Sequence, residues 1–316
     1  MRKITADQIF PVVSAPLENA VLVIDGAGKI LAIDRLADHD PASLETHRGA
    51  LVPGFVNTHC HLELSHLKGA VATGTGLIPF ITGVVTKRAN FSAEQIADAI
   101  ERAEAEMLAG GIVALGDISN APDTFSVKKL GLMRYHTFLE LFDFLQEENA
   151  AVTFERGAEV FEKLAHAPGS TATYVPHAPY SVSKNLFKKI NGSNPKSGAT
   201  VSIHNQETPP ENELFLKKTG SFVDFYGGFG ISLEKFGATG CSSIFYAMEN
   251  LSPENRTLFV HNTLTTRDEI AAAQAWSPNV FWATCPNANL YIENRLPDYR
   301  GFLAENARLT IGTDSL

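Results

Sequence analysis

Two features of this 316-residue sequence predict an α/β fold built on parallel strands. After residue 50, short runs rich in β-branched and aromatic residues alternate with stretches that have the periodicity of amphipathic helices. There are eight such runs, and strands that alternate with helices form parallel sheets. Eight repeats at this length predict a (β/α)8 TIM barrel, with a doubly wound open sheet as the alternative that periodicity does not exclude.

The first 50 residues have a different pattern, which predicts a small β-domain. The apolar runs 21–24 and 29–33 flank Asp25-Gly26, a pair that is typical of a hairpin turn. We therefore expect a β-domain segment over residues 1–50 and the barrel domain over residues 51–316. The sequence stops two residues after Asp314 without an eighth helix, so we expect the C-terminal part of the protein to be missing.

The eight predicted strands are short and rich in β-branched and aromatic residues. They are 51–58, 112–118, 132–140, 171–176, 199–205, 257–262, 279–285 and 308–313. The clearest helix is 92–109, because Ser92 is a typical N-cap and Gly110-Gly111 end the pattern. Further helices are predicted near 153–166, 183–190, 210–219, 241–250, 266–275 and 298–306.

Composition and charge disfavour several classes of function. Thirty-five acidic residues against 26 basic ones give a net charge of −9, which disfavours a nucleic-acid partner because phosphate binding needs a basic face. No apolar run approaches the ~20 residues of a membrane span, and the N-terminus does not resemble a signal peptide. The three cysteines form no C-x-x-C pair, which is typical of a reduced, cytoplasmic protein.

Polar clusters follow four of the predicted strands, at the ends where barrel enzymes carry their active sites. His59 and His61 follow the first strand, and because residues i and i+2 of an extended chain point to the same side, both imidazoles can reach one metal ion. The other strand-end residues are His204 and Glu207, His261, and Asp314. Each has an ordinary structural interpretation by itself, but together they indicate a metal site.

Three neutral imidazoles and one carboxylate suit a borderline-soft divalent ion such as zinc, with one position left for water. Such an ion lowers the pKa of the bound water towards ~7, and a nearby carboxylate can carry protons. Other zinc signatures are not met. His61-Leu62-Glu63 provides the first half of the cytidine-deaminase pattern, but no P-C-x-x-C follows, and there is no H-E-x-x-H.

In combination and in order, these motifs resemble those of the amidohydrolase superfamily. The resemblance runs through PGFVNTHCHLELS (53–65), HAPYSVS (177–183), IHNQET (203–208), FVHNT (259–263), CPNANLYI (285–292) and GTDSL (312–316). Residues 1–50 resemble the N-terminal half of the β-sandwich in this superfamily. In its aminohydrolase (ATZ/TRZ-like) branch, the metal ligands would be His59, His61, His204 and Asp314. The fourth strand, YVPHAPY, lacks the lysine that bridges two metals in binuclear relatives, which favours one ion, with Zn²⁺ expected and Fe²⁺ as the alternative.

The resemblance also implies roles for the other residues. Glu207 would protonate the ring nitrogen, His261 would orient the hydroxide, and Asp314 would accept its proton. Glu63 and His177 are expected to contact the substrate, with hydrogen bonds that hold loops as the alternative. Asn287 and Asn289 are expected to cap a turn, with a role in binding as the alternative. The insert 222–240 would be either a lid or a subunit contact, and residues 62–90 would form another pocket wall.

Within this branch, HxHLELS with HAPYSVS is most similar to deaminases of 6-aminodeoxyfutalosine, in the alternative menaquinone pathway. The expected reaction is attack of zinc-bound hydroxide on an adenine-type nucleoside with release of ammonia. The alternatives are deamination of S-adenosylhomocysteine, methylthioadenosine or guanine, and hydrolysis of a cyclic amide or chloro-triazine at the same site. A catalytically inactive scaffold is a third class. We expect a small-molecule aminopurine nucleoside as the partner, with no nucleic acid and no membrane, and homodimers are common among barrels of this kind.

Overall fold

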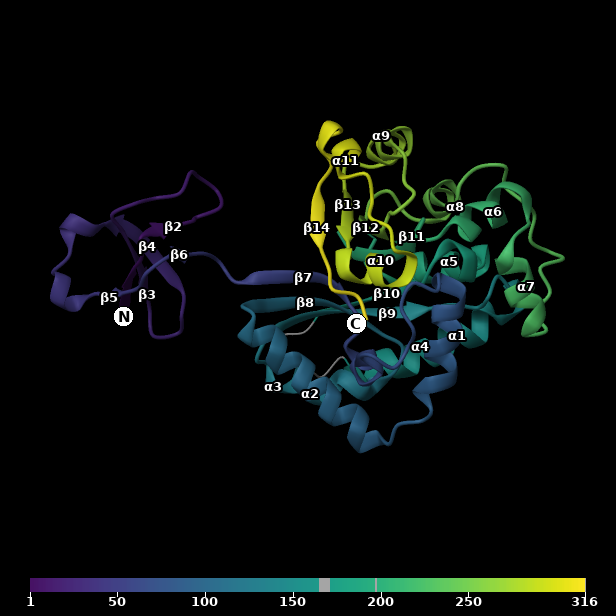
Figure 1. Cartoon of the computed structure of the whole chain (residues 1–316), viewed down its shortest axis with the longest axis horizontal. Coiled ribbons are helices and arrows are strands. Elements are labelled where there is room, and N and C mark those ends of the chain that lie inside the picture. The colour runs from purple at the N-terminus through teal and green to yellow at the C-terminus, as the bar shows by residue number, and fades with distance from the viewer. Residues whose placement is uncertain (165–170, 197, 316) are drawn as a thin grey trace. The chain divides into compact units, whose positions relative to one another are not determined.

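The computed structural model describes residues 1–164, 171–196 and 198–315. The chain divides into two compact units, Met1–Phe55 and Val56–Leu316 (Figure 1). Among the described residues, no helix is both long and apolar enough to cross a membrane.

The smaller unit contains two sheets. Strands β1 (Arg2–Thr5), β3 (Ala20–Ile24), β4 (Ile30–Arg35) and β5 (Glu45–Thr46) form one sheet in the order β4-β3-β1-β5, and β2 (Gln8–Ile9) pairs with β6 (Ala50–Leu51). The predicted hairpin is confirmed, since β3 and β4 are antiparallel and Asp25 accepts hydrogen bonds from the backbone N–H groups of Ala27 and Lys29. A β-sandwich stays a prediction.

The larger unit contains eight strands in the part of the chain that the structure describes, and they form two sheets. One has the order β10-β9-β8-β7 and the other β11-β12-β13-β14. The bounds are β7 Phe55–Cys60, β8 Ile112–Ser119, β9 Arg134–Leu141, β10 Thr171–Pro176, β11 Thr200–Asn205, β12 Arg256–His261, β13 Val280–Thr284 and β14 Leu309–Ile311. The parallel α/β architecture is confirmed, although the first strand lies further along the chain than the predicted 51–58.

The two sheets are joined by hydrogen bonds at both edges. Between β10 and β11, the backbone N–H of His204 donates to the carbonyl oxygen of His177 at 2.9 Å. Between β14 and β7, the N–H groups of Thr313 and Asp314 donate to the carbonyl oxygen of His59, both at 3.0 Å. The carboxyl ends of β7, β11 and β14 are therefore held close together, which brings distant parts of the sequence to one site.

The larger unit also contains the helices that connect these strands. Their bounds are α1 Leu77–Arg88, α2 Ala93–Ala109, α3 Phe125–Leu130, α4 Ala150–Leu164, α5 Lys184–Ser193, α6 Pro209–Lys217, α7 Ser221–Gly228, α8 Ser243–Asn250, α9 Arg267–Trp276, α10 Pro286–Glu293 and α11 Tyr299–Ala304. The predicted helix 92–109 is confirmed, with Ser92 and Gln95 forming a capping box. The last two residues of the predicted helix 153–166 lie outside the described residues.

Sequence patterns did not predict α1, α3, α7 and α10. Helix α1 begins after Gly76, which offers no capping side chain, so the usual start signal is absent. Helix α7 lies at the start of the insert 222–240, and α10 contains Asn289, which was expected to cap a turn. Both are short helices of eight residues, for which periodicity gives little signal.

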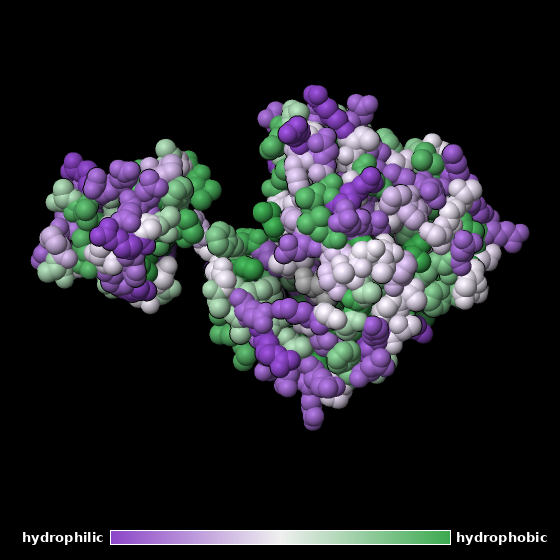
Figure 2. All heavy atoms as spheres, viewed as in Figure 1, coloured by the Kyte–Doolittle hydropathy of each residue, from purple (hydrophilic) through white to green (hydrophobic). Residues whose placement is uncertain are grey.

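Large apolar side chains also reach the surface of the larger unit. Leu303 of α11 and Ile311 of β14 are 67% and 65% exposed. Figure 2 shows hydrophobic and hydrophilic residues interspersed on one face of this unit. Strand β14 therefore carries an apolar side chain that the described residues leave open to solvent.

A buried ion pair fixes the strand that carries the first histidines. The Nζ atom of Lys128 lies 2.6 Å from Oδ2 of Asp117, and both side chains are fully buried. The other carboxylate oxygen of Asp117 accepts a hydrogen bond from the backbone N–H of Leu62 at 3.0 Å. Because Leu62 follows His61 directly, this pair anchors the end of β7 at the point where the chain turns.

We expect Lys128→Met to lower the free energy of unfolding by about 3–5 kcal/mol, because it leaves the carboxylate of Asp117 buried without its counter-charge. Lys184→Met is the matched control, because its ion pair with Glu249 is more than half exposed and such pairs contribute at most about 1 kcal/mol. Urea unfolding of both variants measures the difference. Equal losses would contradict this role of the buried pair.

Candidate metal centre and active site

Four histidines and one aspartate converge at the carboxyl ends of the strands. The Nε2 atoms of His61 and His204 are 3.2 Å apart, and Oδ1 of Asp314 lies 3.3 Å from Nε2 of His61 and 3.4 Å from Nε2 of His59. One ligand atom from each of His59, His204, His261 and Asp314 lies within 4.8 Å of the others. The structure thus brings together the four predicted ligands, and it adds His261 to the cluster.

The chemistry of this cluster fits a divalent metal ion. Neither ring nitrogen of the buried His59 has a hydrogen-bond partner among the described residues. Burial lowers the pKa of His61 to about 3 and the pKa of His204 well below its ordinary value, so these imidazoles are neutral and offer lone pairs. Burial alone would raise the pKa of Asp314, but the nearby His59, 3.4 Å away, and the charge of His261 lower it, so this candidate ligand is a carboxylate.

Hydrogen bonds to the other ring nitrogen set the tautomers of two histidines. Nδ1 of His204 lies 2.7 Å from the carbonyl oxygen of His177 and must donate to it, so Nε2 carries the lone pair that faces the cluster. Nδ1 of His261 likewise donates to Oδ1 of Asn289 at 2.8 Å. Its Nε2 then faces the carboxyl groups of Glu207 and Asp314, at 3.6 and 4.0 Å.

The sequence predicts a turn cap or a binding role for Asn289, and in the structure its side chain orients His261. We expect Asn289→Ala to lower activity or metal affinity by about 10- to 100-fold, as is common when such an orienting partner is removed. Asn287→Ala is the matched control, because Asn287 lies in the same short helix with an exposed side chain. Steady-state kinetics and metal analysis measure the effect. A variant indistinguishable from Asn287→Ala would exclude an orienting role.

Glu207 is held in the site by the helix that follows it, α6. The backbone N–H groups of Gln206 and Glu207 donate to the two carboxylate oxygens of Glu211, at 3.0 and 3.1 Å. Gln206 has a positive φ of 46° and His261 one of 73°, so both strand ends adopt a conformation that side chains disfavour. The surrounding hydrogen bonds stabilise these turns and place Glu207 opposite His261.

Burial raises the pKa of Glu207 to about 8, although the neighbouring His261 opposes the shift. Burial likewise would lower the pKa of His261, but Glu207 and Asp314 raise it above its ordinary value. The two side chains can therefore share and transfer a proton near neutral pH. This arrangement can donate a proton to a molecule bound beside the cluster.

A cavity opens over the cluster, with a polar and an apolar part. The polar part includes His61, Glu140, His177, His204, Glu207, His261 and Asp314. The apolar part includes Leu77, Phe80, Ile81 and Val84 from α1, Phe142 and Phe144 from the segment after β9, and Phe225 and Tyr226 from α7. The segment 62–90 contributes to the wall of this cavity, as the sequence predicted. The start of the insert 222–240 contributes to it as well.

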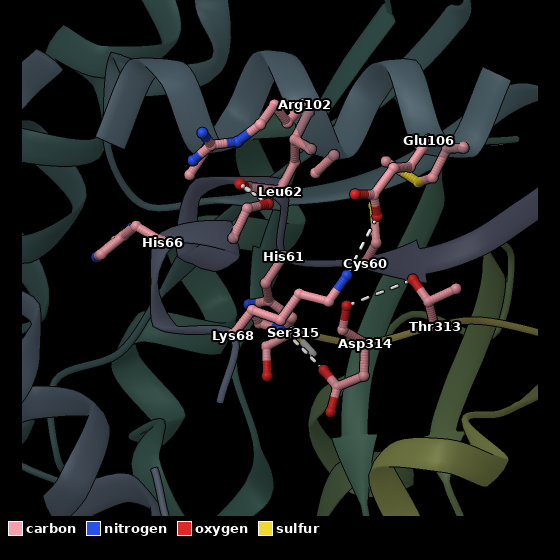
Figure 3. Close-up of a pocket in the computed structure, with 14 residues that line it drawn as sticks. Cys60, His61, Leu62, His66, Lys68, Arg102, Glu106, Thr313, Asp314 and Ser315 are labelled. Carbon is pink, nitrogen blue, oxygen red and sulfur yellow. Dashed lines mark hydrogen bonds and ion pairs between the residues drawn. The ribbon is translucent and has the colours of Figure 1, made fainter. Parts of the chain in front are cut away.

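A second cavity borders the same cluster from the side of α2 (Figure 3). His61 and Asp314 line it from one side, and Arg102 and Glu106 of α2 line it from the other. Lys68 crosses its rim to form an ion pair with Glu106 at 3.1 Å. The two cavities thus share three lining residues, His61, Asp314 and Ser315.

The two residues expected to contact a substrate lie in different surroundings. One carboxylate oxygen of the buried Glu63 accepts hydrogen bonds from the backbone N–H groups of Asn120 and Ala121 at 3.0 and 3.1 Å, and the other lies 3.4 Å from Arg88. Glu63 is not among the residues that line the cavity, which favours the interpretation that it holds a loop. His177 lines the cavity, with Nδ1 2.6 Å from Oγ of Ser181.

Sequence reasoning missed Glu140, which lies at the end of β9 and lines the cavity. Burial raises its pKa to about 8. The available signal was an acidic residue at the carboxyl end of an otherwise apolar strand, FLELF. A single glutamate has no partner at a fixed spacing, so this signal was not distinctive.

Histidines and an aspartate gathered at the carboxyl ends of parallel strands are typical of metal-binding proteins with an α/β fold. Residues 50–316 match the Amidohydrolase family, and the chain belongs to this family.

Two curated relatives are named as deaminases. The chain is 25% identical over 266 residues to the adenosine deaminase of Helicobacter pylori, which covers 84% of this chain and 64% of the relative. It is 26% identical over 284 residues to the aminodeoxyfutalosine deaminase of Nitratiruptor sp., which covers 88% and 65%. The chain therefore spans less than two thirds of the length of these relatives.

Solved structures share the fold. The aminofutalosine deaminase of Helicobacter pylori in complex with methylthio-coformycin has a TM-score of 0.81 at 22% identity, with 100% of this chain and 77% of that one covered. The atrazine chlorohydrolase of Arthrobacter aurescens complexed with zinc has a TM-score of 0.75 at 17% identity, with 99% and 72% covered. At these identities the similarity shows the fold alone.

Proposed function

We propose that this chain carries the active site of a metal-dependent deaminase of adenine-type nucleosides, with 6-aminodeoxyfutalosine as the leading substrate. The observation that carries the proposal is the placement of Glu207, a buried carboxyl group able to hold a proton, beside a metal-ligand cluster and over a cavity. The names of the curated relatives support the same reaction. Menaquinone biosynthesis in the cytoplasm would be the setting of this substrate.

The proposal also covers the architecture of the two units of the chain. Residues 51–316 would form a (β/α)8 barrel whose halves are the two four-stranded sheets, and residues 1–50 would be part of a β-sandwich domain. The hydrogen bonds at both sheet edges support a closed arrangement. Such a barrel places catalytic side chains from several strands around one opening, which is where the cluster lies.

The proposed ligands of one divalent ion, Zn²⁺ or alternatively Fe²⁺, are His59, His61, His204 and Asp314. The two ring nitrogens of His59 without a hydrogen-bond partner and the neutral imidazoles support this set. When bound, such an ion lowers the pKa of a water molecule and makes hydroxide available at neutral pH.

The side chains of this chain would then move the protons. The carboxyl group of Glu207 would protonate N1 of the base, which makes C6 more susceptible to attack by water. Asp314 would accept the proton that the attacking water loses, and Nε2 of His261 would orient that water from the side of Glu207. The proton held by Asp314 would then pass to the 6-amino group, so that the C6–N bond breaks and ammonia leaves. The remaining hydroxyl at C6 would return its proton to Glu207 as it becomes the oxo group of the product.

Ultraviolet-monitored turnover across a substrate panel tests this proposal. The panel contains 6-aminodeoxyfutalosine, S-adenosylhomocysteine, methylthioadenosine, adenosine and guanine, with a cyclic amide and a chloro-triazine added as representatives of the alternative reactions. We expect zinc-loaded protein to convert 6-aminodeoxyfutalosine fastest. Turnover of another purine would support deamination but change the assigned substrate. Turnover of the cyclic amide or the chloro-triazine alone would overturn deamination.

A further inference from the structure

The proposed mechanism leaves one buried carboxyl group of the cavity without a role. Glu140 is 5% exposed and lies at the carboxyl end of β9. Its Oε2 accepts a hydrogen bond from the side-chain amide of Asn120 at 3.2 Å, and the same amide donates to the backbone oxygen of Glu140 at 3.1 Å. Its Oε1 is buried and has no hydrogen-bond partner among the described residues.

The ring N–H of His204, which lies close to Oε1 of Glu140, is already committed elsewhere. Oε1 of Glu140 lies 3.5 Å from Nδ1 of His204, but that nitrogen donates to the carbonyl oxygen of His177 at 2.7 Å. A buried carboxyl oxygen without a hydrogen-bond partner is costly in a folded protein, whether or not the group is ionised. Because Glu140 lines the cavity, a group that enters the cavity can supply the missing hydrogen bond.

A second metal ion is a poor candidate for this position. Ligand atoms of Glu140, His177 and His204 do lie within 4.8 Å of one another. However, Nδ1 of His204 carries a hydrogen and has no lone pair to offer, and Nδ1 of His177 is paired with Oγ of Ser181 at 2.6 Å. The position is therefore better suited to a hydrogen-bond donor than to a cation.

We propose that Glu140 is a substrate-binding residue that accepts a hydrogen bond from a sugar hydroxyl of the nucleoside. This inference rests on the proposed function, because it takes the ligand to be a nucleoside. The ring nitrogens of an adenine-type base are acceptors, and its amino group is the reacting group. In a nucleoside whose 5′ substituent carries no donor, such as 6-aminodeoxyfutalosine, the remaining donors are the sugar hydroxyls. Glu140 is also followed by Phe142 and Phe144, which line the apolar part of the same cavity. A sugar beside Glu140 would thus have apolar surface close by for its substituent.

Substrates that lack one hydroxyl test this assignment. The best nucleoside substrate, its 2′-deoxy and 3′-deoxy analogues and a 7-deaza analogue are compared with zinc-loaded wild type, Glu140→Ala and Glu140→Gln. We expect Glu140→Ala to lower kcat/KM about 10- to 100-fold on the hydroxylated substrate, mainly through KM, and to leave one deoxy analogue almost unaffected. Glu140→Gln keeps a hydrogen-bonding group and is expected to lose less.

Glu104→Ala is the matched control. Glu104 is a buried carboxyl group, 3% exposed, that hydrogen-bonds to Tyr135 and is not among the cavity residues. Its variant should keep the preference of the wild type for the hydroxyl. Thermal unfolding of each variant separates loss of folding from loss of binding. The comparison of hydroxylated and deoxy substrates in the wild type involves no substitution, so a folding defect cannot affect it.

The outcomes that would overturn the role of Glu140 differ from the outcome that would overturn the proposed function. Equal losses for Glu140→Ala on all four substrates, or a wild type indifferent to both hydroxyls, would overturn the role of Glu140 and leave the proposed function standing. If Glu140→Ala loses activity on both deoxy analogues but leaves the 7-deaza analogue almost unaffected, Glu140 would be assigned to the base, and this would also overturn a sugar contact. A wild type that neither deaminates nor binds any nucleoside in calorimetry would overturn the proposed function together with this inference.

Discussion

Glu207→Gln is expected to lower kcat for deamination by about 10²- to 10⁴-fold, the range that general acid–base catalysis supplies. Glutamine has the same size and can hydrogen-bond to the base, but it cannot give up a proton. Glu207 is 3% exposed, and burial raises its pKa to about 8, so at neutral pH the native side chain can hold the proton that N1 receives. Ammonia release under substrate saturation measures kcat.

The metal site should survive this substitution, because Glu207 is not among the four proposed ligands. Metal analysis of Glu207→Gln should therefore match the wild type, and Glu104→Gln provides a control for the loss of a buried carboxyl group outside the cavity. A Glu207→Gln enzyme with unchanged kcat would contradict the proton-transfer role. Loss of the metal together with activity would instead make Glu207 part of the metal site.

His204→Ala is expected to remove both the metal and the activity. Its Nε2 faces the cluster 3.2 Å from Nε2 of His61, and its tautomer is fixed by the carbonyl oxygen of His177. Deletion of this imidazole leaves two histidines and a carboxylate, which is one ligand fewer than the proposed set. We expect the metal content after dialysis to fall well below one equivalent and ammonia release to fall to background.

His136→Ala is the matched control for that variant. His136 also lies on a strand of the larger unit, but its ring nitrogens pair with the hydroxyl groups of Thr171 and Thr173. This variant should keep one equivalent of metal and most of the activity. If His204→Ala retained its metal as His136→Ala does, then His204 would not be a ligand.

Much of the fold could be predicted because the signals are local. The helix 92–109 has a capping box at Ser92 and Gln95, and the strand–helix alternation needs only the hydrophobic pattern. The first strand was placed too early because Pro53-Gly54 interrupts the apolar run, and β7 begins only at Phe55. Helix α1 was missed because neither a cap nor strong amphipathicity marks its start.

The candidate site could be predicted where residues repeat at fixed spacings or follow strands. His59 and His61 are two residues apart, and His204, His261 and Asp314 each end a strand. Glu140 and Asn289 could not be found in this way, because their importance depends on contacts with residues that are distant in the sequence. Asn289 pairs with His261, 28 positions away, and Glu140 of β9 approaches His204 of β11 past the intervening strand β10.

The most direct test of the central claim is a zinc titration of deamination. Chelator-treated protein is reconstituted with increasing Zn²⁺, and ammonia release from the best nucleoside substrate is measured at each step. The site described here predicts no activity without metal, a linear rise to one equivalent and a plateau beyond it. Full activity without metal, a requirement for two equivalents, or no ammonia at any zinc concentration would contradict a one-metal deaminase.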